Sequence, residues 1–162
     1  MYDWTGEADA ERFVRTYADG ILRLCLARGL SRQDAQDICQ ELFLKLLTAR
    51  STFHDAEHEK AWVLRAAGNA CKNLLRAAHH SRRAPLEEAQ TVAAPASGPR
   101  AEVRDEVEKL PPRYRDTVRL YYLAGYSADE VACILHISPA AVRKRLDRAR
   151  DMLKTGLEGA FV

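Results

Sequence analysis

The sequence predicts an all-α protein made of two small helical domains joined by a flexible linker. Three observations favour this fold class. Apolar residues recur with a 3.6-residue period along most of the chain, alternating patterns typical of strands are almost absent, and a stretch rich in Pro, Ala, Ser and Gly interrupts the periodicity. With 162 residues, 47% of them hydrophobic, the chain is long enough to bury a core in each part.

The first predicted helix carries a single apolar stripe: Phe13, Tyr17, Ile21, Leu24 and Cys25. Gly29 follows this stripe, and glycine ends helices well because it adopts the left-handed conformation without strain. Ser31 is suited to cap the next helix, whose stripe consists of Ile38, Leu42 and Leu46. A looser segment over residues 50–60 leads to a third helix, expected over about residues 60–79. These helices form the predicted N-terminal domain, residues 5–83.

Residues 84–100 are the predicted linker, because their composition cannot bury enough apolar surface to fold alone. The C-terminal domain is expected at residues 101–157. A helix over residues 101–109 precedes the pair Pro111-Pro112, which ends it and begins another helix. Proline has this effect because it lacks the backbone N–H that a helix interior needs.

Two closely spaced helix starts near the C-terminus have the pattern of a helix-turn-helix. Ser127 and Glu130 have the spacing of a capping box at the start of the first helix. Ser138 and Pro139 mark the second start, since a serine hydroxyl satisfies unpaired backbone N–H groups and proline is tolerated at the first helical position. One apolar stripe of the second helix is expected to face inward: Val142, Leu146, Ala149 and Leu153.

The opposite side of this second helix is mostly basic and carries Arg143, Lys144, Arg145, Asp147, Arg148 and Arg150. Such a face favours a helix that lies in the major groove of DNA. A solvated face on a scaffold helix is the alternative, because a run of charge alone is weak evidence. The net charge of +2 does not decide between the two, but a second basic stretch, residues 61–83, contains no Asp or Glu.

Four cysteines, Cys25, Cys39, Cys71 and Cys133, lie among apolar residues and form no Cys-x-x-Cys pair, so we expect reduced thiols in the core. The first residues contain acids where a signal peptide needs a basic start, and no apolar stretch approaches the ~18 residues of a membrane span. These features predict a soluble cytoplasmic protein without membrane insertion. No cofactor and no metal is expected.

Three segments resemble the extracytoplasmic-function sigma factors of bacteria, which are promoter-recognition subunits of RNA polymerase. They are DAQDICQELFLKLL at residues 34–47, AWVLRAAGNACKNLLR at residues 61–76 and LPPRYRDTVRLYYLAGYSADEVACILHISPAAVRKRLDRAR at residues 110–150. The resemblance implies a protein that binds core RNA polymerase, recognises promoter DNA as duplex and single strand, and promotes transcription initiation without catalysing a reaction. It also implies an anti-sigma factor as a further partner.

The resemblance assigns a role to each segment. The first would dock on the polymerase through polar residues opposite its apolar stripe: Asp37, Gln40 and Glu41. The second would hold the minus-ten element as single-stranded DNA, a task that needs a positive surface and a hydrogen bond to a base edge. Its expected contacts are Arg65, Asn69, Lys72 and Arg76. The preceding loop, with Phe53 and His54, would shape a pocket for an unstacked base, whereas Trp62 is expected to be buried.

The third segment would read the minus-thirty-five element as a duplex, with contacts from Ser138, Arg143, Lys144, Asp147 and Arg148. Arg143 suits a bidentate guanine contact, and Arg148 suits a phosphate or a base. Ser138 can take a phosphate through its backbone N–H at the helix start. Asp147 can accept a hydrogen bond from a cytosine amino group, or it can pair with Arg143 or Arg150 at helical spacing.

The chain departs from the family pattern at Gly68, where arginine is common, at Asn73, where aspartate is common, and at His136, where a turn glycine is common. Histidine tolerates a positive φ better than most residues. The turn at His136 is therefore expected to survive at a cost of about 1 kcal/mol.

Two other functions fit parts of the sequence. An autonomous helix-turn-helix regulator would explain the C-terminal segment, but it needs neither the docking segment nor the acid-free helix. A metalloenzyme would rest on His54, Glu57 and His58, which match the H-x-x-E-H zinc-peptidase pattern. That match is short and has no evident third ligand, so the pattern does not favour catalysis.

Overall fold

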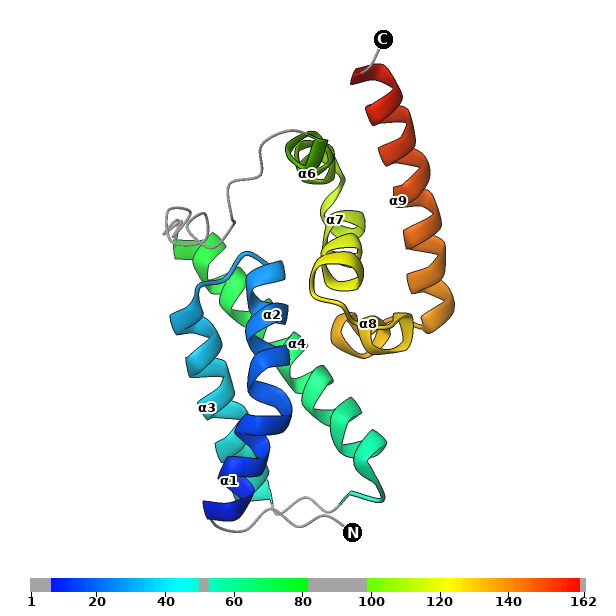
Figure 1. The fold of residues 1–162 in the computed structure, drawn as a ribbon. Helices are drawn as coiled ribbons and strands as arrows, with labels where there is room; N and C mark the ends of the chain where they lie inside the picture. The colour runs from blue at the N-terminus through cyan, green and yellow to red at the C-terminus, as the bar shows by residue number, and fades with distance from the viewer. Residues whose placement is uncertain (1–6, 50–52, 82–98, 161–162) are drawn as a thin grey trace.

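The computed structural model describes residues 7–49, 53–81 and 99–160 (Figure 1). Within these ranges no β-strand is present, which confirms the predicted all-α fold class. The α-helices are α1 (Glu7–Phe13), α2 (Asp19–Ala27), α3 (Arg32–Ala49), α4 (Ala56–Ser81), α6 (Pro99–Lys109), α7 (Pro112–Val118), α8 (Ala128–Leu135) and α9 (Pro139–Ala160). Two π-helical turns, η1 (Val14–Ala18) and η2 (Arg119–Leu123), connect α1 to α2 and extend α7.

Helices α1 to α4 enclose most of the larger apolar core. Both predicted stripes are buried in it: Phe13, Tyr17, Ile21, Leu24 and Cys25 from the first helical segment, and Ile38, Leu42 and Leu46 from α3. Gly29 has a φ of +84°, as expected for the residue that ends a helix. Ser31 precedes α3, and its Oγ accepts a hydrogen bond from the backbone N–H of Asp34 at 3.1 Å.

The third predicted helix begins earlier than expected. Helix α4 begins at Ala56, so the expectation of a looser segment as far as residue 60 is wrong. Asp55 provides the reason, because its Oδ1 accepts a hydrogen bond from the backbone N–H of His58 at 2.7 Å. This cap begins the helix before its apolar periodicity is evident.

Glu59 of α4 is a buried carboxylate that forms hydrogen bonds with the first helical segment. It is only 1% exposed, and it accepts hydrogen bonds from both terminal nitrogens of Arg12 at 3.1 and 3.2 Å. The Tyr17 hydroxyl donates a third hydrogen bond at 2.6 Å. Burial, together with this hydrogen bond, raises the pKa of Tyr17.

A smaller core holds the C-terminal helices together and consists of Val107, Leu110, Tyr114, Val118 and Ala149. Pro111 precedes α7 and Pro112 is its first residue, which confirms the predicted break. Helix α6 begins at Pro99, so the last two residues of the predicted linker are helical instead. Residues 84–98 of that linker lie outside the described ranges, and the domain boundaries stay a prediction.

The larger core also contains C-terminal residues: Leu120, Ala124, Tyr126, Val131, Ala132, Ile134, Val142 and Leu146. They come from η2, the following turn, α8 and α9. Figure 1 shows α8 lying against α4, with α2 on the side toward α7. The two predicted domains are therefore packed on each other.

Cys25 and Cys71 are buried with their Sγ atoms 3.6 Å apart, and all four cysteines are free thiols. The hydrogen bond with Cys71, and then burial, raises the pKa of the Cys25 thiol. A protonated, buried thiol is unreactive, as expected for a core cysteine. Along the part of the chain that the structure describes, no helix is long and apolar enough to cross a membrane.

Candidate nucleic-acid interface

The helix-turn-helix has the predicted caps. At the start of α8, the Ser127 Oγ accepts from the Glu130 backbone N–H, and the Glu130 carboxylate accepts from the Ser127 backbone N–H. His136 ends α8 in the left-handed conformation, with φ 58° and ψ 42°. The Ser138 Oγ accepts a hydrogen bond from the backbone N–H of Ala141 at 3.1 Å and caps α9. The tight turn therefore forms with histidine at the left-handed position.

Helix α9 buries its apolar stripe and exposes the opposite face. Val142, Leu146 and Ala149 are at most 3% exposed. The predicted contact residues are all exposed: Ser138, Arg143, Lys144, Asp147 and Arg148. The structure thus leaves this basic surface available for a ligand outside the protein.

Asp147 is paired with Arg150 and not with Arg143. Its Oδ1 accepts a hydrogen bond from Nη1 of Arg150 at 2.9 Å. The Arg150 Nε also donates to the hydroxyl of Tyr122 at 2.7 Å, and this hydrogen bond raises the pKa of Arg150. Arg150 thus holds Asp147 within the basic face.

A small cavity of about 150 Å³ lies between α7 and α9. Its lining is strongly basic and consists of Arg113, Tyr114, Ala141, Lys144, Arg145 and Arg148. Hydrogen bonding to Arg148, and then to Arg113, lowers the pKa of the Tyr114 phenol. A concentration of positive charge beside the exposed face of α9 suits a phosphate group.

Arg113 and Arg145 are not among the contacts that the sequence predicts. Arg145 lies on the same helix as the predicted contacts, and its charge was a signal that could have found it. Arg113 lies on α7, 30 residues before Arg143 of α9. The apolar periodicity within α9 carries no information about α7, so it could not indicate that Arg113 lies beside the α9 residues.

The candidate residues on α4 share one exposed face: Arg65, Asn69, Lys72 and Arg76. Their spacing of four, three and four residues places them along one side of the helix. Opposite them, Val63, Ala67, Ala70 and Cys71 are buried in the core. The structure therefore forms the continuous polar surface that a nucleic-acid backbone can follow.

Phe53, expected to help shape a base pocket before α4, does not expose its ring to a ligand. This ring is only 2% exposed and packs against Trp62, with ring centroids 6.1 Å apart, and against His58. Trp62 is half-buried against the core, in line with its expected burial. Phe53 is therefore placed to support the loop from within the core, and its part in shaping a base pocket stays a prediction. His54 remains exposed.

The candidate docking residues on α3, Asp37, Gln40 and Glu41, are all exposed. Gln33 donates a hydrogen bond to Asp37 at 3.1 Å, and Lys45 forms an ion pair with Glu41 at 3.1 Å. Leu44 lies beside them and is 58% exposed. Leu44 is not among the predicted docking residues, although a leucine outside the apolar stripe of a helix is a visible signal for a contact surface.

The H-x-x-E-H segment does not form a metal centre within the described residues, where no group of three potential ligands occurs. His54 precedes α4, so the two histidines do not lie on one helix. The His58 Nδ1 accepts a hydrogen bond from the backbone N–H of His54 at 3.2 Å. Its ring stacks on that of His54, with centroids 5.2 Å apart. These contacts belong to the start of α4.

Two family models match the chain. The model described as Sigma-70 region 2 matches residues 13–81, and the model described as Sigma-70, region 4 matches residues 100–153. The first match contains the candidate faces of α3 and α4, and the second contains the helix-turn-helix.

Named relatives cover most of the chain. It is 30% identical to the RNA polymerase sigma-H factor of Pseudomonas aeruginosa, over 90% of this chain and 84% of that protein. It is 26% identical to the ECF RNA polymerase sigma factor SigE of Mycolicibacterium smegmatis, over 95% of this chain. The chain spans 65% of the length of that SigE.

Two solved structures are similar over nearly the whole chain. One contains CnrH in complex with the cytosolic domain of CnrY, with a TM-score of 0.65 and 25% identity, and the match covers 95% of this chain and 90% of that one. The other contains the sigma factor RpoE in complex with the anti-sigma factor NepR from Bartonella quintana. Its TM-score is 0.60 at 17% identity, with 94% and 98% of the two chains covered, so it shows similarity of fold.

Proposed function

Since the chain belongs to the extracytoplasmic-function family of RNA polymerase sigma factors, we propose that it binds core RNA polymerase and directs it to promoters. One observation carries this proposal. Two helices far apart in the sequence, α4 and α9, each bury an apolar face and expose a basic one. Two such surfaces suit a protein that contacts two separate promoter elements.

Helix α9 would read the minus-thirty-five element as a duplex. Arg143 would form a bidentate contact with guanine in the major groove. Arg148 and Lys144 would contact phosphates or neighbouring bases, together with Arg113 and Arg145 of the basic cavity. The start of α9 at Ser138 would bind a phosphate through backbone N–H groups.

Asp147 would contribute to sequence preference at some cost in overall affinity for DNA. A carboxylate is repelled by phosphate, but it can accept a hydrogen bond from the amino group of cytosine. Arg150 holds one carboxylate oxygen, which fixes the side chain while the other oxygen remains to accept from a base. Its pairing with Arg150 also offsets part of the repulsion from phosphates.

Helix α4 would hold the minus-ten element after strand separation. Arg65, Lys72 and Arg76 would follow the backbone of the single strand. Asn69 lies among them on the same face, and its side-chain amide can both donate to and accept from a base edge. The exposed His54 would lie at the entrance to this surface.

The exposed face of α3 would dock on the polymerase. Asp37, Gln40 and Glu41 provide polar contacts, and Leu44 adds apolar surface beside them. An exposed apolar residue with polar neighbours is typical of a protein-binding surface. The ion pairs on this face are solvent-exposed, so they can exchange for contacts with a partner at little cost.

We also propose that the protein catalyses no reaction itself and acts in the cytoplasm, where the polymerase transcribes DNA. An anti-sigma protein is a further proposed partner. Support comes from the two similar structures, in which CnrH is bound to the cytosolic domain of CnrY and RpoE to the anti-sigma factor NepR.

Binding to a labelled promoter library, measured with and without core polymerase, tests the proposed function. We expect sequence-specific binding only when the chain and core polymerase are both present. Tight, sequence-specific binding by the chain alone, unchanged by polymerase, would instead identify an autonomous regulator.

A further inference from the structure

Arg150 joins a tyrosine outside the helix-turn-helix to the acidic residue on α9. Its Nε donates a hydrogen bond to the hydroxyl of Tyr122 at 2.7 Å, and its Nη1 donates to Oδ1 of Asp147 at 2.9 Å. The centre of the guanidinium lies 5.8 Å from the centroid of the Tyr122 ring. Tyr122 belongs to η2, 28 residues before Arg150. The three side chains therefore form a series of contacts that connects two separate helical segments.

Arg150 can orient Asp147 only if its own guanidinium is held in place. The side chains of this ion pair are 49% exposed for Arg150 and 74% exposed for Asp147, and exposed ion pairs within a helix contribute little to stability. An arginine side chain also loses much rotamer freedom when it is held in one geometry. A second contact on the guanidinium is therefore needed for the Asp147 carboxylate to keep one orientation.

Tyr122 supplies that contact from a ring that is itself held in place. The ring packs edge to face against half-buried Tyr121, with centroids 4.9 Å apart and the ring planes at 85°. Val118, one helical turn earlier, shares the smaller core with Ala149, which directly precedes Arg150. This packing places η2 beside α9. Because a tyrosine side chain has only two torsion angles, its hydroxyl is less mobile than the end of an arginine.

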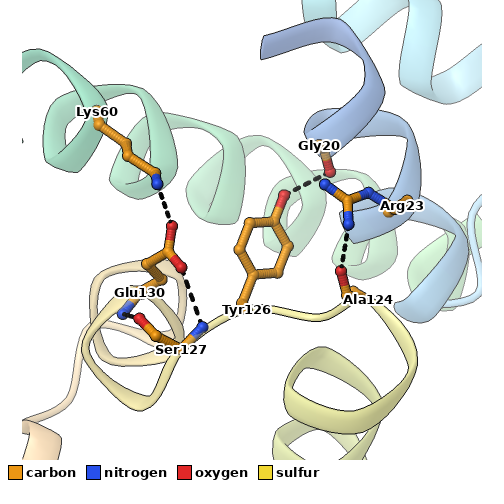
Figure 2. Close-up of polar contacts among 7 residues, drawn as sticks. All are labelled: Gly20, Arg23, Lys60, Ala124, Tyr126, Ser127 and Glu130. Atoms are coloured by element: carbon orange, nitrogen blue, oxygen red, sulfur yellow. Dashed lines mark hydrogen bonds and ion pairs between the residues drawn. The ribbon is translucent and has the colours of Figure 1, made fainter. Parts of the chain in front are cut away.

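A tight turn after η2 connects Tyr122 to the helix-turn-helix. Gly125 has a φ of +79° in this turn, a conformation that favours glycine. The backbone N–H of Tyr126 donates to the backbone oxygen of Leu120 at 3.1 Å. Figure 2 shows the chain passing from this turn directly to Ser127, where the capping box begins α8. The position of η2 is therefore fixed relative to the two helices that follow it.

We propose that Tyr122 is a positioning residue for the base preference of α9, an inference that rests on the proposed function. Tyr122 holds Arg150, and Arg150 orients the Asp147 carboxylate so that its second oxygen accepts a hydrogen bond from one base. Without the tyrosine hydroxyl, the guanidinium is free to turn toward a DNA phosphate, with which arginine forms strong bidentate hydrogen bonds. Asp147 then loses its orientation, and α9 loses its preference at that base pair.

Replacement of Tyr122 by phenylalanine tests this role. The variant keeps the exposed ring and removes only the hydroxyl that accepts from Arg150. The matched control is Tyr121→Phe, which makes the same chemical change one residue earlier. Transcription by core polymerase with each full-length protein, on a library of promoter templates, gives the base preference at every position. The NMR signal of the Arg150 Nε–H group in the free full-length protein reports the hydrogen bond without polymerase or DNA.

We expect Tyr122→Phe to relax the preference at the base pair that Asp147→Ala also affects, by about fivefold or more. Tyr121→Phe should keep the preferences of the wild type. The double variant Tyr122→Phe/Asp147→Ala should match Asp147→Ala alone, because the tyrosine acts through Asp147. An unchanged preference in Tyr122→Phe, or in Asp147→Ala, would overturn the proposal. Additive losses in the double variant would also overturn it, since they would mean that Tyr122 acts independently of Asp147.

The NMR measurement tests the contact separately from transcription. The Arg150 Nε–H signal should be resolved in the wild type and in Tyr121→Phe, and it should move to the position of a free arginine in Tyr122→Phe. The same signal in all three proteins would overturn the proposed contact. Absence of chain-dependent transcripts from every protein, wild type included, would contradict the proposed function. Chain-dependent transcripts with an unchanged base preference in Tyr122→Phe would contradict only the role of Tyr122.

Discussion

Asp147 accepts a hydrogen bond from Arg150 at 2.9 Å on the exposed face of α9, four residues beyond Arg143. The pair places one carboxylate within a surface proposed to contact DNA. We predict that Asp147→Ala raises overall affinity for promoter DNA, because it removes a charge that phosphates repel. It should also relax the preference at one base pair by about 1–3 kcal/mol. Transcription from a promoter library reports both effects, and an unchanged base preference would show that Asp147 only pairs with Arg150.

Replacing Arg143 with alanine should lower transcription from a cognate promoter roughly 5- to 100-fold, the effect of one lost bidentate base contact. Arg143 is exposed and lies outside the buried Val142–Leu146–Ala149 stripe, so the fold should not change. Binding to core polymerase should therefore be unaffected. Lys154→Ala, at an exposed position further along the same helix, is the control. Equal losses of polymerase binding and transcription would refute the assigned role.

Charge reversal at Glu41 should weaken binding to core polymerase, in contrast to Arg143→Ala, which should leave that binding unaffected. Glu41→Lys is expected to weaken binding to core polymerase about tenfold or more, because it places like charges where complementary ones are expected. It should leave the helix-turn-helix intact. Since Glu41 also pairs with Lys45, the double variant Glu41→Lys/Lys45→Glu serves as the control, as it keeps an ion pair within α3. Recovery of polymerase affinity in the double variant would show that the internal pair, and not a contact with polymerase, causes the loss.

Removal of the Tyr17 hydroxyl should destabilise the N-terminal helices. Tyr17→Phe keeps the ring in the core but takes one hydrogen-bond donor from the buried carboxylate of Glu59. A hydrogen bond to a buried charged group contributes about 1–3 kcal/mol. Urea denaturation should show a loss of that size in the free energy of unfolding. No loss would mean that Arg12 alone satisfies Glu59.

Stability should fall at alkaline pH. Burial is the main cause that raises the pKa of Tyr17 and of Tyr126 above the ordinary tyrosine value. The folded state therefore keeps these protons where the unfolded chain releases them. The free energy of unfolding should be insensitive to these groups below about pH 10 and should decrease as the pH rises further. Denaturation curves between about pH 9 and pH 11 test this, and Tyr17→Phe/Tyr126→Phe should show a smaller decrease. An equal decrease in the free energy of unfolding of the double variant would contradict a role for these two tyrosines.

The local features of the fold could be predicted from the sequence, because each depends on residues close together in the chain. Ser127 with Glu130, and Ser138 with Pro139, signal helix starts within four residues, and Gly29 signals a helix end. The start of α4 is the exception. Apolar periodicity predicts a start near residue 60, whereas the capping hydrogen bond of Asp55 begins the helix at Ala56.

The contacts between the two parts of the chain could not be predicted from the sequence. Gly68 departs from the family pattern, but nothing near it in the chain indicates that the backbone of Ile134 fills the missing side-chain space. His136 likewise is predicted only as a turn residue, because its contact with Arg65 spans 71 residues. The basic cavity could not be predicted for the same reason. Arg113 lies beside the α9 residues only because α7 packs on α9.

Promoter-directed transcription in vitro tests the central claim most directly. Core RNA polymerase, the purified chain and a template library would be combined, and the start sites of the transcripts would be sequenced. We predict defined start sites that share two upstream sequence elements and that appear only when the chain and polymerase are both present. Two results together would contradict the claim: core polymerase initiates at the same sites with and without the chain, and the chain alone binds duplex DNA sequence-specifically.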